Sequence, residues 1–271
     1  MKIFSVVSKW YPIGVFFIIY HLSFSPAGAQ TNVVSSYQLG AGETRLWDTY
    51  LSQEKFKGQG FTFLYSSERC KPGRRWNTVW KHEVSRAMGD DRAERVSETS
   101  TEYTLVFGKR YNWEMNGFRL QAGAVLAFNI GAIQNSANSN NPVQARQSLQ
   151  LMPSAKLSRD FTLIGQPFTI HEELQLPLVG EMFSPNYGQS YYELFSLGNY
   201  DRNIVLTTPF SAPHFRNQLS LDVHVPRFAT LRLSYLATVL QSDVNGLKSS
   251  VSHQRVMIGF VKEFDISWHR P

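Results

Sequence analysis

Apolar and polar residues alternate along most of the chain with a period of two. The clearest segment is residues 144–158, where one set of alternate positions is mostly apolar and the other mostly polar. The apolar row contains Ala145, Gln147, Leu149, Leu151, Pro153, Ala155 and Leu157, and the polar row contains Gln144, Arg146, Ser148, Gln150, Met152, Ser154, Lys156 and Ser158. Because successive side chains of a strand point to opposite faces, this pattern predicts a β-strand between two different surroundings.

The same split recurs in residues 101–107, 118–130, 168–178, 218–225 and 231–239. Several of these segments exceed the roughly 5–6 residues of a strand in a soluble protein, and match the roughly 9–11 residues that a tilted strand needs to cross a bilayer. In lipid every backbone N–H and C=O must be paired, so such strands have to close into a barrel. The apolar row would then face lipid and the polar row the interior.

We therefore predict an all-β fold, an antiparallel up-and-down transmembrane β-barrel of about twelve strands. The predicted strands cover residues 37–47, 59–68, 75–85, 101–112, 118–130, 145–158, 167–179, 190–198, 202–209, 217–225, 229–241 and 251–264. Long and short connections alternate between them, as they do between the two sides of bacterial outer-membrane barrels. With both termini in the periplasm the strand number is even, and ten is the alternative if residues 190–209 form a loop. A soluble periplasmic β-protein that binds an apolar ligand is a further alternative, with the apolar row in a dry core.

The N-terminal residues 1–29 have the features of a secretory signal peptide. Lys2 and Lys9 precede an apolar, aromatic stretch, and Ala27 and Ala29 supply the small residues of a cleavage site. We expect cleavage after Ala29, which leaves residues 30–271 as one barrel domain. The alternative is a retained helical anchor, although the apolar run is shorter than about 20 clean residues.

Composition excludes several other classes of protein. Of 271 residues, 42% are hydrophobic and 18% charged, with a mean hydropathy of −0.26, which is far too polar for a multi-span helical membrane protein. The net charge of +6 is spread along the chain without a Lys/Arg block, so we expect no nucleic acid as partner. The single cysteine, Cys70, excludes an intramolecular disulfide and a cysteine-rich metal site.

Several stretches resemble a Bacteroidales family catalogued as domain of unknown function 3316. They are residues 47–52 (WDTYLS), 56–61 (FKGQGF), 67–69 (SER), 176–180 (LPLVG), 183–192 (FSPNYGQSYY) and 253–259 (HQRVMIG). The resemblance implies an outer-membrane β-barrel of unknown function in a Gram-negative bacterium, and it supplies no catalytic residues. The partners expected of such a barrel are outer-membrane lipid and the barrel-assembly machinery.

The inward rows of the predicted barrel carry charges of both signs. The predicted lumen-facing charged residues are Glu102, Arg119, Arg146, Lys156, His171, Glu173, Asp222, His224 and Arg232. In a narrow barrel, long opposed charges would pair and close the lumen, and the alternative is a narrow channel for small polar solutes. A possible ligand loop near the barrel mouth contains Phe183, Pro185, Tyr187, Tyr191 and Tyr192.

Candidate catalytic or metal chemistry is sparse in the sequence. His171 and Glu173 share the inward face of one strand, but two ligands are too few for a tight metal site. We expect them instead to pair with Arg146 or Lys156 on the neighbouring strand. A lipid hydrolase at the membrane edge needs a serine and a histidine on one face, and the adjacent Ser252 and His253 point to opposite faces. We therefore expect no metal, no cofactor and no enzymatic activity, with a membrane-edge lipid hydrolase as the alternative.

Overall fold

The structure is a computed structural model that describes residues 31–139, 141–225 and 229–266. The predicted signal peptide lies outside the described residues. The strands are β1 (Thr31–Asp48), β2 (Phe56–Cys70), β3 (Trp76–Asp90), β4 (Ser97–Met115), β5 (Phe118–Asn135), β6 (Val143–Leu163), β7 (Gln166–Gln175), β8 (Val179–Phe183), β9 (Ile204–Thr207), β10 (His214–Val225), β11 (Ala229–Val244) and β12 (Leu247–Ile266), with the short helix α3 (Tyr191–Phe195) between β8 and β9.

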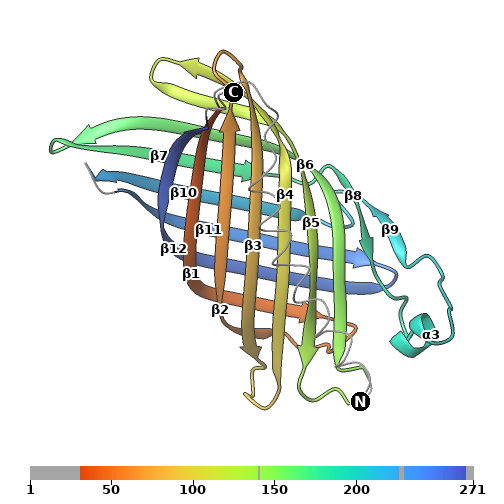
Figure 1. Ribbon diagram of the computed structural model, residues 1–271. Coiled ribbons are helices and arrows are strands. Elements are labelled where there is room, and N and C mark those ends of the chain that lie inside the picture. Colours follow the sequence, from red (N-terminus) through yellow and green to blue (C-terminus); the bar gives the residue numbers. More distant parts are fainter. Residues whose placement is uncertain (1–30, 140, 226–228, 267–271) are drawn as a thin grey trace.

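Ten of these twelve strands form a closed antiparallel barrel (Figure 1). Strands β1 to β7 follow one another around the wall, β7 pairs with β10, and β12 pairs with β1 from Thr31↔Ile266 to Asp48↔Ser249. The remaining two strands, β8 and β9, lie outside the ring and extend it beside β6. The predicted antiparallel barrel is confirmed, with ten strands in the ring and twelve in all.

The predicted seventh strand, residues 167–179, is divided into two strands, β7 and β8. Strand β7 ends at Gln175 and β8 begins at Val179, although the Leu176 and Leu178 N–H groups between them still donate to carbonyls of β6. The register against β6 shifts by one residue between Gln175↔Ser154 and Val179↔Leu151. Pro177 lies at this shift, where a residue without an N–H is tolerated. Strand β9 then pairs with β8, and Figure 1 shows both strands and α3 at the side of the barrel.

The predicted strand at residues 190–198 is wrong, because residues 191–195 form helix α3. Ser190 is the N-cap: its hydroxyl accepts from the Glu193 N–H, and the Glu193 carboxylate accepts from the Ser190 N–H. This reciprocal capping box stabilises a helix start and explains why the tyrosines that follow are not extended.

Most strands are longer than predicted, and the turns are correspondingly shorter. β11 and β12 remain paired as far as Val244↔Leu247, so the connection between them is the two-residue turn Asn245–Gly246. Both turn residues have positive φ, as in the tight hairpin turns that match strand twist. The end of the barrel that holds Thr31 and Ile266 has the short connections 71–75, 116–117 and 164–165, whereas the opposite end holds 49–55, 91–96, 136–142 and 176–213. We call these the terminus end and the loop end.

The two faces of the wall differ as the alternation requires. Leu126, Ile130, Leu157 and Leu233 belong to the outward row and are exposed. The inward row is buried and mixes polar side chains with apolar clusters, one of which contains Leu64, Leu236 and Met257. Among the described residues, no helix is both long enough and apolar enough to cross a membrane.

Candidate functional site: the polar interior of the barrel

The middle of the lumen is crossed by a network of buried charges. Lys81 Nζ on β3 lies 2.6 Å from Glu173 Oε1 on β7, and Arg110 Nη1 on β4 lies 3.3 Å from Glu173 Oε2. Arg110 and Lys156 also meet Glu68 on β2, at 3.5 and 3.0 Å respectively. Strands β2, β3 and β4 do not pair with β6 or β7, so these contacts span the interior. We call these five residues the central network.

Further contacts cross the lumen beside the central network. The Arg216 guanidinium on β10 donates to the Glu83 carboxylate on β3. Gln38 on β1 accepts from Ser234 at 2.7 Å and from Gln218 at 3.3 Å. Buried charges are tolerated when they are paired and hydrogen-bonded, so the opposed rows form a closely connected interior.

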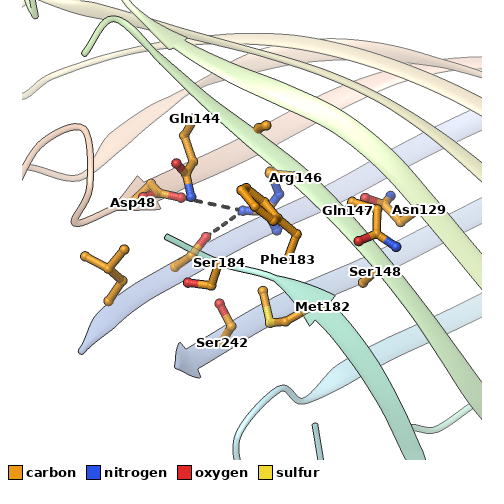
Figure 2. Close-up of a pocket in the computed structure, with 13 residues that line it drawn as sticks. Asp48, Asn129, Gln144, Arg146, Gln147, Ser148, Met182, Phe183, Ser184 and Ser242 are labelled. Carbon is orange, nitrogen blue, oxygen red and sulfur yellow. Dashed lines mark hydrogen bonds and ion pairs between the residues drawn. The ribbon is translucent and has the colours of Figure 1, made fainter. Parts of the chain in front are cut away.

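Arg146 organises the loop end of the lumen. Its Nε lies 3.2 Å from Glu102 Oε1, and its Nη1 lies 2.5 Å from Ser249 Oγ and 3.9 Å from Asp48 Oδ2. Figure 2 shows Arg146 pointing toward Asp48 in a small pocket that Phe183 and Ser184 also line. Glu102 in turn faces His253 across the barrel at 3.5 Å.

The terminus end opens into a polar vestibule of about 660 Å³. Six of the nine predicted lumen charges line it, namely Arg119, Lys156, His171, Asp222, His224 and Arg232. Arg232 binds both carboxylate oxygens of Asp222, at 2.5 and 2.6 Å. Arg119 lies 2.8 Å from Asp160 in a more exposed pair. The vestibule therefore carries both signs of charge in close pairs.

One linear arrangement in the vestibule has the composition of a nucleophile relay. His171 Nδ1 lies 2.8 Å from Ser158 Oγ, and its Nε2 lies 3.0 Å from Asp222 Oδ2. A histidine between a hydroxyl and a carboxylate is able to activate the hydroxyl. Here, however, the bidentate contact of Arg232 already compensates the charge of Asp222. The geometry fits a hydrogen-bonded wall better than an activated serine.

A family model described as "Protein of unknown function (DUF3316)" matches residues 21–270. The chain belongs to this family. No curated protein matches the sequence of this DUF3316 chain.

Solved structures that resemble the DUF3316 chain are outer-membrane proteins at very low sequence identity. The translocator domain of the autotransporter NalP from Neisseria meningitidis has 10% identity, a TM-score of 0.36 and coverage of 94% of this chain and 96% of that chain. The outer membrane protease OmpT from Escherichia coli has 7% identity, a TM-score of 0.35 and coverage of 89% and 98%. Neisserial surface protein A has 9% identity, a TM-score of 0.30 and coverage of 89% and 100%.

The predicted ion pairs of His171 and Glu173 with Arg146 or Lys156 are wrong. Lys156 is the cross-strand neighbour of Glu173, yet its Nζ lies 3.0 Å from Glu68 Oε2 across the lumen. Arg146 pairs with Glu102, and His171 with Asp222. Long side chains reach partners on opposite strands because the barrel is narrow, and strand adjacency alone does not choose the partner.

Sequence reasoning missed several members of the lumen network. Lys81, Glu83, Arg110 and Arg216 are buried on the inward rows of β3, β4 and β10, and Glu68 on β2 contacts Arg110 and Lys156 in the lumen. The signal was present, because the period of two places Lys81 and Glu83 on one face of the predicted strand 75–85. Arg216 lies just before the predicted start of its strand at residue 217.

The predicted ligand loop divides into packed and exposed residues. Tyr191 Oη donates to Gln144 Oε1 at 2.8 Å and accepts from the Ala145 N–H at 2.7 Å, and its ring lies 5.5 Å from that of Tyr50. This burial raises the pKa of the Tyr191 hydroxyl above its ordinary value. The remaining loop residues are Phe183, half-buried, Pro185, buried, and Tyr187 and Tyr192, both exposed.

His253, the candidate for a lipid hydrolase, lies in the lumen. Its Nδ1 is 3.1 Å from Thr44 Oγ1 and 3.1 Å from Arg255 Nη2, whereas Ser252 belongs to the outward row. The side chains of Ser252 and His253 therefore point away from each other. This position gives no support to a serine–histidine pair facing lipid.

Proposed function

We propose that the chain is an integral protein of the bacterial outer membrane, exported by a signal peptide that is cleaved after Ala29. Every strand of the ring carries exposed apolar side chains on its outward row, and the ring of ten strands is closed, as a lipid environment demands. The terminus end with its short turns lies in the periplasm and the loop end outside the cell. Insertion then depends on the barrel-assembly machinery and on outer-membrane lipid.

We further propose a non-enzymatic, structural or adhesive role in which a closed barrel presents the loop end to the outside. The observation that carries this proposal is the central network, because Lys81 and Glu173 meet at 2.6 Å between strands on opposite sides of the lumen. A chain of paired charges across the interior leaves no continuous path for a hydrated solute. The protein then acts by binding through the loops of the loop end.

Conductance of the purified, refolded protein in planar lipid bilayers tests the proposal. Heat-modifiable migration on a gel first shows that the protein is a folded barrel, and extraction that requires detergent shows that it resides in the membrane. We expect no steady conductance at physiological salt. Release from the envelope without detergent would instead favour the soluble periplasmic β-protein.

A narrow channel for small polar solutes is the second candidate. The vestibule favours it, because a polar cavity of about 660 Å³ already extends from the terminus end to Glu68 and Lys156 of the central network. In that case the wild-type protein conducts in discrete steps, and neutralising Lys156 changes the ion selectivity. A wild-type protein that is silent while a variant with a broken central network conducts supports the closed barrel instead.

A further inference from the structure

The outer wall formed by β12, β1 and β2 changes character part-way toward the loop end. The row of cross-strand neighbours Val256, Ala41 and Phe61 is apolar. Continuing toward the loop end, Gln254, Glu43 and Gln59 form the next outward row, followed by Ser252, Arg45 and Lys57. A change from apolar to charged side chains along a barrel wall marks the edge of the hydrocarbon layer.

Four basic residues surround a groove of about 610 Å³ on the outer surface just beyond this edge. They are Arg45, Lys55, Lys57 and Lys248, and Trp47 and the exposed Phe210 line the same groove. Three of the basic side chains have acidic partners: Glu43 contacts Arg45 at 2.7 Å and Lys57 at 3.1 Å, and Asp243 lies 3.7 Å from Lys248. These four cations and two anions give a local charge of 4 − 2 = +2.

The cations remain available to a ligand. Arg45, Lys57 and Lys248 are mostly exposed, and exposed ion pairs are weak, so a ligand anion is able to replace Glu43 or Asp243 as partner. Lys55 lies 5.2 Å from the centre of the Trp47 ring, which holds its ammonium group over the groove. The groove therefore presents several donors for charge-assisted hydrogen bonds to one anionic group.

The surface directly below the groove is apolar and unusually open. Leu39, Phe61 and Val256 are 58%, 51% and 60% exposed. They stand on the same three strands as the basic groove, on the side toward the middle of the wall. Cations above and open apolar side chains below match a ligand with a negative headgroup and acyl chains, which neither a nucleic acid nor an acidic peptide has.

We propose that this surface binds the phosphorylated glycolipid of the outer leaflet, with the sugar phosphates on Arg45, Lys55 and Lys57 and the acyl chains on Leu39, Phe61 and Val256. The proposal rests on the proposed function, because only an outer-membrane barrel with the loop end outside brings this groove to that leaflet. It assigns the lipid to the side of the barrel formed by β12, β1 and β2.

The test measures binding of purified lipid A to the folded protein in zwitterionic detergent, by native mass spectrometry and by the shift of the thermal unfolding midpoint. The variant is R45Q/K55Q/K57Q. The matched control is R75Q/R159Q/K262Q, which removes the same charge from the terminus end, where Lys262 lies 5.8 Å from the Phe260 ring centre as Lys55 lies over Trp47. We expect the groove variant to bind lipid A at least about tenfold more weakly and the control to bind like the wild type, since losing one charge-assisted hydrogen bond has about that effect.

Dephosphorylated lipid A provides a second arm that needs no variant. The wild-type protein should bind it about tenfold or more weakly than lipid A. Equal binding of the two lipids, or equal loss in both variants, overturns the proposal, as does binding of inorganic phosphate with the same affinity as lipid A. Failure of the proposed function looks different: the protein then lacks heat-modifiable migration and does not insert into vesicles at all.

Discussion

Replacing Glu173 by glutamine tests whether the middle of the barrel is closed. Glu173 accepts a hydrogen bond from Lys81 at 2.6 Å and from Gln175 at 2.7 Å, and Arg110 lies 3.3 Å from its other oxygen. The side chains of Lys81, Glu173 and Arg110 are only 5%, 10% and 1% exposed. Glutamine keeps the shape of the side chain but removes the only carboxylate that forms an ion pair with Lys81 among the described residues.

The expected cost follows from the burial of these partners. Breaking a buried ion pair by removing one partner costs about 3–5 kcal/mol, because the remaining charge stays uncompensated in a poorly solvated interior. Arg110 keeps Glu68 at 3.5 Å, which places the expected loss for Glu173→Gln at the lower end, about 3 kcal/mol. The control is Asp160→Asn: Asp160 lies 2.8 Å from Arg119, but their side chains are 62% and 45% exposed, so the expected loss is at most about 1 kcal/mol.

The assay is reversible urea unfolding of the protein in lipid vesicles, followed by tryptophan fluorescence and by heat-modifiable migration. The two variants remove one carboxylate charge each from pairs of similar length, so the difference between their unfolding free energies measures the effect of burial. Adding Lys81→Met to Glu173→Gln should recover much of the loss, because the uncompensated ammonium is gone. If Glu173→Gln costs no more than Asp160→Asn, the central network is solvated and the argument for a closed lumen fails.

Three other predictions use separate parts of the molecule. Ile164 occupies a turn with φ of 53° and is almost fully exposed, so Ile164→Asn should stabilise the barrel by about 1 kcal/mol in the same urea assay, since a β-branched residue is strained in the left-handed region. Burial raises the pKa of Tyr191 above its ordinary 10.0, so the contribution of Tyr191 to loop docking is complete below pH 10.0 and is lost as the pH rises through the raised pKa. Limited trypsin digestion of the loop should therefore accelerate only at that high pH. Tyr191→Phe should accelerate the digestion already at neutral pH, because it removes the hydrogen bond to Gln144. A fluorophosphonate probe should leave Ser158 unlabelled, because Arg232 already compensates the carboxylate beside its histidine; stoichiometric labelling that Ser158→Ala abolishes would make the vestibule a hydrolase site.

The barrel was predictable from the sequence because lipid and lumen impose opposite demands on alternate residues. Leu149 and Leu151 on β6 share the outward row, and Gln150 and Met152 share the buried inward row, as the period of two requires. Strand ends were less predictable. At residues 31–36 (TNVVSS) the alternation is weak, although the pairing of β1 with β12 begins at Thr31. Hydrogen bonds to the neighbouring strand extend the element there without help from the hydrophobic pattern.

The region between β7 and β10 was predicted less well because local and tertiary signals conflict. Tyr191 and Tyr192 favour a strand. Ser190 and Glu193, three residues apart in sequence, instead form a capping box that begins a helix. Pro177 was the readable sign that the seventh strand divides. The ten-strand alternative came from the same region, and it describes the closed ring.

Partners within the lumen could not be read from the sequence for a geometric reason. A period of two fixes the face of a residue, but its height depends on the stagger that closes the whole ring. Lys156 and Glu173 are cross-strand neighbours, yet Lys156 binds Glu68, which lies 88 residues away in sequence, and Glu173 binds Lys81. The choice between these carboxylates is made by the distance across the barrel. With the strand number and the stagger known, Glu68 and Lys81 could have been placed opposite β6 and β7. The sequence therefore lacks the closure of the ring, whereas the chemistry of the side chains is readable in it.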